Sequence, residues 1–156
     1  MKLIEFLQWY NYDCGAAVIY AAALSFGVDP GDYEDVVKAI CHPKIGTPPH
    51  KLRKYLRKLK LKVRTKHRLT IEQLDEIFKS SDVLILAPIK AFAPVSNDGH
   101  WVIIYKVNHA SIHFFCPWKG KIAWPIDKFL DRWYDVDADG KYYKQYGLII
   151  YGRNYA

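Results

Sequence analysis

The sequence lacks the features that define several common protein classes. Its 156 residues include only three cysteines, Cys14, Cys41 and Cys116, whose odd number and wide spacing argue against a disulfide framework. The longest stretch without a charged residue runs from Cys14 to Val28, and its 15 residues are too few to span a bilayer. The sequence also has no glycine-rich phosphate loop, internal repeat or low-complexity linker. These absences exclude a disulfide scaffold, a membrane-spanning helix and a P-loop nucleotide-binding site.

The remaining composition is that of an ordinary folded domain. Hydrophobic residues make up 51% of the chain and charged residues 25%, and the length suits one domain over residues 1–156. The N-terminal residues reach Glu5 without the apolar core of a signal peptide, so we expect a cytoplasmic protein. We predict no cofactor and no metal site, because Cys41, His42 and His50 lack zinc-ligand spacing.

The net charge of +7 comes from one segment. Residues 51–68 contain ten lysines or arginines and no acid, so 13 basic and 16 acidic residues remain elsewhere, a balance of −3. Leucines recur in this segment at helical spacing, which favours a solvated lysine-rich helix face. The alternative is a surface that attracts an acidic peptide, a nucleic acid or an anionic membrane. We do not expect nucleic acid to be the partner.

The period of the apolar residues changes along the chain from helical to strand-like. This order predicts an α+β domain, with a helical N-terminal half that packs on a C-terminal antiparallel sheet. The predicted helices cover 13–26, 32–40, 48–59, 70–78 and 125–133, and the predicted strands cover 61–64, 83–89, 101–107, 111–115, 121–124 and 147–152.

Cys14 stands where a small-residue helix begins, which is the environment that a nucleophilic thiol needs. A helix N-terminus supplies partial positive charge and free N–H groups, and an imidazole from elsewhere can accept the thiol proton. His100 is the best candidate for this base, because it follows Gly99 at the start of a predicted strand. Gln8, six residues before Cys14, could donate its amide to a developing oxyanion.

Four motifs in this order resemble the bacteriocin-processing (double-glycine leader) peptidase family of papain-like cysteine peptidases, and nearly the whole chain takes part in the resemblance. The motifs are Gln8, "DCG" at 13–15, "GHWVII" at 99–104 and "CPWKG" at 116–120. The resemblance implies that Cys14 is the nucleophile, His100 the general base and Gln8 the oxyanion donor. It further implies a peptide substrate with small residues such as Gly-Gly before the cleaved bond, and a separate export transporter as partner.

The chain departs from the family pattern at Cys116, where the family has the aspartate that orients the histidine. A thiol is a weak and uncharged acceptor. Cys116 is therefore a candidate third member of the site. The residue that orients His100 could instead be Asn108, Asp98 or Asp127, or the enzyme could work as a Cys–His dyad. A further interpretation is that the site has lost its catalytic activity and only binds.

Other functions remain open at this point. Cys14 taken alone would be read as a small buried residue, and only its combination with Gln8 and His100 favours a nucleophile. The alternative function is a catalytically impaired peptide-binding module of the same fold. The segment "DVDADG" at 135–140 resembles the start of a calcium loop, but position twelve would be Tyr146, so we predict an acidic turn rather than a cation site at Asp135, Asp137 and Asp139.

Overall fold

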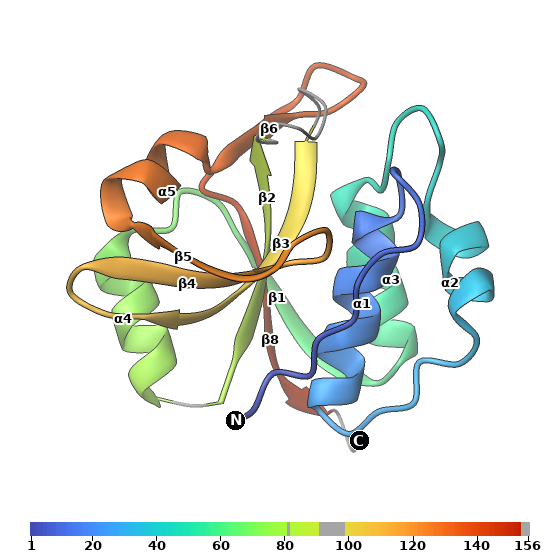
Figure 1. Ribbon diagram of the computed structural model, residues 1–156, viewed down its shortest axis with the longest axis horizontal. Helices are drawn as coiled ribbons and strands as arrows, with labels where there is room; N and C mark the ends of the chain where they lie inside the picture. The colour runs from blue at the N-terminus through green and yellow to red at the C-terminus, as the bar shows by residue number, and fades with distance from the viewer. Residues whose placement is uncertain (81, 91–98, 154–156) are drawn as a thin grey trace.

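The computed structural model describes residues 1–80, 82–90 and 99–153, and its centre is a six-stranded sheet with the order β1-β8-β2-β3-β4-β5 (Figure 1). Every neighbouring pair of strands in this sheet is antiparallel. The strands of the sheet are β1 (Leu61–Lys66), β2 (Leu84–Lys90), β3 (Gly99–Val107), β4 (Ser111–Cys116), β5 (Gly120–Pro125) and β8 (Gly147–Arg153).

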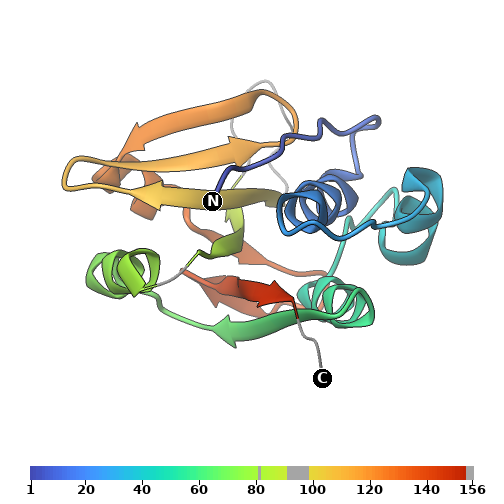
Figure 2. The same cartoon turned by 90° about the horizontal axis from the view of Figure 1, so that it is seen from below.

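The described residues form five helices, which lie on two sides of the sheet (Figures 1 and 2). The first group contains α1 (Cys14–Ser25), α2 (Tyr33–Ile40) and α3 (Pro49–Lys58), and the second contains α4 (Ile71–Ser80) and α5 (Ile126–Arg132). The strand alternation separates the apolar side chains accordingly. In β2, Leu84 and Leu86 pack in the core that includes α1, whereas Ile85 packs with the residues of α4 and α5.

The structure confirms the predicted α+β class, and it confirms local signals in the helices. Helix α1 ends before Gly27, which has a φ of 73°, a left-handed conformation that glycine adopts without strain. The capping box that opens α4 is also present. The Thr70 backbone N–H donates to Gln73 Oε1 at 3.0 Å, and the Gln73 N–H donates to Thr70 Oγ1 at 3.1 Å.

A short hairpin was not predicted. Strands β6 (Tyr134–Val136) and β7 (Tyr142–Lys144) form a separate two-stranded sheet, and the acidic segment 135–140 lies in and beside their turn. Asp137 Oδ1 accepts hydrogen bonds from the backbone N–H groups of Asp139 and Lys141, each at 2.9 Å. The described residues contain no group of three or more side chains that could hold a metal ion. Within the described ranges, no helix has the length and apolarity to cross a membrane.

Candidate active site

Cys14 is the first residue of α1, a largely buried helix that consists mainly of small residues. Nine of the 12 residues of α1 are buried, so the helix packs tightly between the sheet and its neighbours. Gly15 is needed for this approach, since a Cβ at that position would lie 2.6 Å from the Thr47 Cβ. Cys14 itself is 7% exposed.

The Cys14 sulfur meets strand β3 beside the predicted base. It accepts hydrogen bonds from the backbone N–H groups of Trp101, which directly follows His100, and of Gly15. Burial is the main reason that the pKa of the Cys14 thiol rises to about 12, and the Trp101 N–H group partly opposes that rise. Cys14 is thus next to the backbone of Trp101, the residue that follows His100 and is distant from Cys14 in the sequence.

His100 is the second residue of β3, is 4% exposed and contacts Cys116. Its Nε2 lies 3.2 Å from the Cys116 sulfur, at the end of β4. Burial lowers the pKa of His100 to about 4, so the imidazole is neutral at pH 7. The structure therefore brings the candidate third member to the ring, while its role in catalysis stays a prediction.

The alternative orienting residues lie elsewhere or outside the described residues. Asn108 follows the far end of β3, where its Oδ1 accepts the backbone N–H groups of Ala110 and Ser111. Asp127 is an exposed residue of α5. Asp98 falls outside the described residues. Among the candidates that the structure describes, Cys116 is the one with a contact to His100.

Gln8 lies close to the start of α1, but its amide N–H groups point to partners within the same segment. Its backbone N–H donates to the carbonyl of Pro117 at 2.9 Å, which joins the N-terminal segment to the turn after Cys116. The side-chain Nε2 donates to the Tyr10 carbonyl at 2.6 Å and lies 3.4 Å from Asp13 Oδ1. The Gln8 Oε1 is buried and has no hydrogen-bond partner among the residues that the structure describes. Donation to an oxyanion requires one of these N–H groups to turn away from its present partner.

A second cysteine lies at the same helix terminus. Cys41 accepts a hydrogen bond from Thr47 Oγ1 at 3.2 Å and another from the backbone N–H of Ala16. Burial raises the pKa of the Cys41 thiol. Sequence reasoning did not assign Cys41 a place near Cys14, because its neighbours in the chain give no sign of that contact.

The basic segment 51–68 lies apart from this site. It forms α3 and the edge strand β1, which β8 and β2 separate from β3. Leu52 and Leu56 are fully buried, which agrees with the predicted leucine stripe and its solvated outer face. A cleft of about 630 Å³ lies here, lined in part by Arg57 and Arg64.

A mixed fold that joins a cysteine at a helix N-terminus to a histidine at a strand start is characteristic of papain-like cysteine peptidases. The sequence model of the Peptidase C39 family matches residues 5–137. The chain therefore belongs to the Peptidase C39 family and is a cysteine peptidase. A search of curated protein sequences found no match.

Solved structures share the fold over nearly the whole chain. A double-glycine motif protease from an AMS/PCAT transporter, in complex with the leader peptide, is 16% identical with a TM-score of 0.68, and the match covers 96% of this chain and 91% of that chain. The peptidase domain of Streptococcus ComA, a bi-functional ABC transporter, is 16% identical with a TM-score of 0.70 and coverages of 95% and 97%. A C39-like peptidase from Bacillus anthracis is 13% identical with a TM-score of 0.72 and coverages of 98% and 96%.

Proposed function

We propose that the protein cleaves a peptide bond with Cys14 as nucleophile and His100 as general base. The observation that supports this proposal is the hydrogen bond to the Cys14 sulfur from the backbone N–H of Trp101, the residue that follows His100 in β3. The contact between His100 Nε2 and Cys116 leaves Nδ1 as the ring nitrogen that accepts the thiol proton.

In this mechanism the reaction is acyl transfer. The imidazole takes the proton of Cys14 as the sulfur attacks the peptide carbonyl, and it returns that proton to the leaving amine. Water then hydrolyses the thioester with the same imidazole as base. The backbone N–H of Cys14 and the side-chain amide of Gln8 donate to the oxyanion, once the amide has turned from the Tyr10 carbonyl.

The substrate that we propose is a leader peptide with small residues, such as Gly-Gly, before the cleaved bond. The similar structures support this class, because one is a double-glycine motif protease with its leader peptide and another belongs to an ABC transporter. A separate transporter is accordingly the proposed partner. Large apolar side chains beside Gln8 suit peptide contacts, since Trp9 is 55% exposed and Trp118 is 46% exposed.

The test is cleavage of a fluorogenic peptide with a Gly-Gly sequence by purified protein. We expect turnover by the wild type and by Cys41→Ser, and loss of turnover in Cys14→Ala and in His100→Ala. Cys41→Ser is the matched control, because Cys41 lies at the same helix terminus but has no role in the mechanism. Iodoacetamide at pH 6 should modify Cys14 more slowly in His100→Ala than in the wild type.

The binding module is the competing function, and the replacement of the family aspartate by Cys116 favours it. If the protein is a binding module, the wild type and Cys14→Ala should bind the leader peptide with equal affinity, and neither should release a cleavage product. That result would reject the peptidase mechanism for this chain.

A further inference from the structure

Asp13, the residue before the nucleophile, has a buried carboxylate with an unusually complete set of donors. It is 0% exposed. Its Oδ2 accepts the Trp9 backbone N–H at 2.8 Å and the Tyr33 hydroxyl at 2.6 Å. Its Oδ1 accepts the Tyr10 backbone N–H at 2.9 Å and lies 3.4 Å from Gln8 Nε2. Three of the four donors belong to consecutive residues.

These contacts join the segment 8–10 to two helices. Asp13 precedes α1, and Tyr33 is the first residue of α2, so the carboxylate connects both helix N-termini to that segment. The Tyr33 ring also packs against Phe6 and Trp9, with centroids 4.6 Å apart in each case. Burial and the hydrogen bond to Asp13 raise the pKa of Tyr33, which keeps its hydroxyl as a donor.

The same carboxylate works against the formation of a thiolate. Its negative charge contributes to the raised pKa of the Cys14 thiol. A group whose purpose was to activate the nucleophile would have the opposite effect. Asp13 must therefore contribute to the site in another way, through the position that its hydrogen bonds give to the segment that carries Gln8.

We propose that Asp13 is a positioning residue that holds segment 8–10, and with it the Gln8 amide, beside Cys14. This inference rests on the proposed peptidase function, in which Gln8 donates to the oxyanion. Asp13 acts through the two backbone N–H groups and the side-chain amide, and it does not contact the substrate. Sequence reasoning missed this role, because a residue next to a candidate nucleophile is easily read only as a helix cap.

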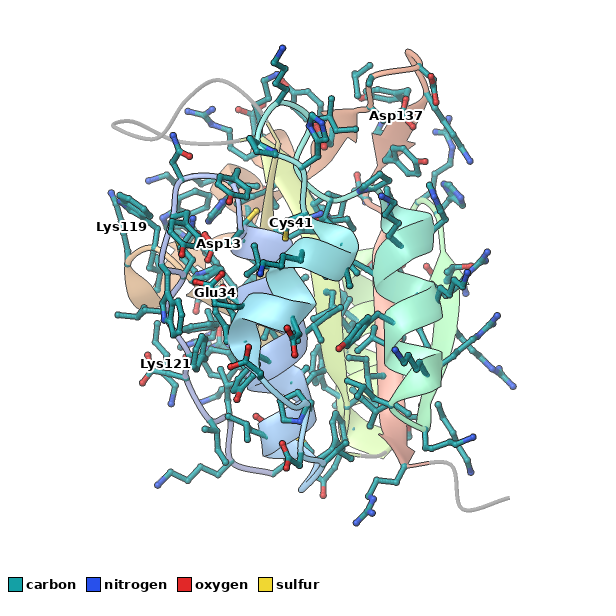
Figure 3. All side chains as sticks on the ribbon, turned by 90° about the vertical axis from the view of Figure 1, so that its right-hand side faces the viewer. Asp13, Glu34, Cys41, Lys119, Lys121 and Asp137 are labelled. Carbon is teal, nitrogen blue, oxygen red and sulfur yellow. The ribbon has the colours of Figure 1, made fainter. Side chains whose placement is uncertain are left out.

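The test compares Asp13→Asn with Asp137→Asn. Asp137 is a matched control, because it also accepts two backbone N–H groups and a tyrosine hydroxyl, that of Tyr143 at 3.3 Å. It lies in the β6–β7 turn, away from Asp13, as Figure 3 shows. An asparagine at either position replaces an acceptor oxygen by a donor.

Three measurements separate positioning from general damage. In Asp13→Asn we expect kcat for the Gly-Gly peptide to fall at least tenfold with KM within twofold of the wild type, since oxyanion donors act in the transition state. Amide hydrogen exchange at Trp9 and Tyr10 should become at least tenfold faster. Alkylation of Cys14 by iodoacetamide should hold its rate or rise, because that reaction forms no oxyanion and a negative charge has been removed. Asp137→Asn should match the wild type in all three.

Specific results would overturn the proposal. A wild-type kcat in Asp13→Asn, or unchanged exchange at Trp9 and Tyr10, shows that the carboxylate does not hold the segment. A parallel fall in kcat and in alkylation shows a general structural defect instead. If Asp13→Asn does not fold, Tyr33→Phe removes one of the four donors and should show the same pattern at smaller amplitude. If the protein is not a peptidase, the wild type will show no cleavage that depends on Cys14. The hydrogen-exchange measurement still decides in that case whether Asp13 holds segment 8–10.

Discussion

Burial of His100 makes the stability of the protein depend on pH in a window that the structure defines. The pKa of His100 is lowered from 6.5 to about 4 in the folded protein, with burial as the cause. Between these values the unfolded chain binds more protons than the native state. Stability is therefore fully present above pH 6.5, falls as the pH drops through this window and levels off below pH 4. With 1.36 kcal/mol per pKa unit, the loss is about 2 kcal/mol at pH 5 and about 3 kcal/mol at pH 4.

The assay is urea unfolding of the wild type and of His100→Gln at pH 7.5 and pH 5. Carboxyl groups titrate in both proteins, so the difference between their pH dependences isolates the histidine. We expect the free energy of unfolding to decrease by about 2 kcal/mol more in the wild type than in His100→Gln. Equal decreases would mean that His100 is protonated as readily in the native state as in the unfolded chain, which would refute the role of burial.

Three further substitutions test other parts of the site and fold. Cys116→Asp places a carboxylate against His100 Nε2, so the pKa of His100 should rise. The fall of kcat/KM on the acid side of a pH–rate profile should then occur at higher pH, and a profile like that of the wild type would contradict the contact. Gly15→Ala should lower the free energy of unfolding by about 1–3 kcal/mol in urea, because the new methyl group collides with Thr47, and wild-type stability would count against the close packing. Thr70→Ala removes the cap of α4 and should cost about 1 kcal/mol by the same measurement with kcat unchanged, whereas loss of activity would link α4 to the site.

The fold was predictable wherever a local pattern decided the structure. The continuous apolar, β-rich runs of β2 and β3 and the capping box at Thr70 depend on neighbours in the sequence, and both appear as predicted. The β6–β7 hairpin was not predictable in this way. Its strands have three residues each, and their sequence shows no alternation long enough to distinguish a strand from a turn.

The candidate site was predictable as a set of residues but not as a geometry. The helix start at Cys14 and the strand start at His100 follow from local sequence, and the resemblance to a peptidase family connected them. The direction of the Gln8 amide depends on the Tyr10 carbonyl and on Asp13, and no sequence pattern gives side-chain directions in an irregular segment. The contact of His100 with Cys116 likewise depends on where β4 ends against β3.

The thiol at position 116 determines which protonation state the resting site adopts. A carboxylate there would favour the imidazolium and would oppose the effect of burial, but a neutral thiol does not, and burial lowers the pKa of His100. Burial also raises the pKa of Cys14, and both groups are therefore neutral at pH 7 in the resting protein. A neutral pair reacts by transferring the proton during attack rather than from a preformed thiolate. In the proposed mechanism negative charge develops on the substrate oxygen during the attack, so an oxyanion donor must be well placed, and the proposed hold of Asp13 on segment 8–10 serves that placement.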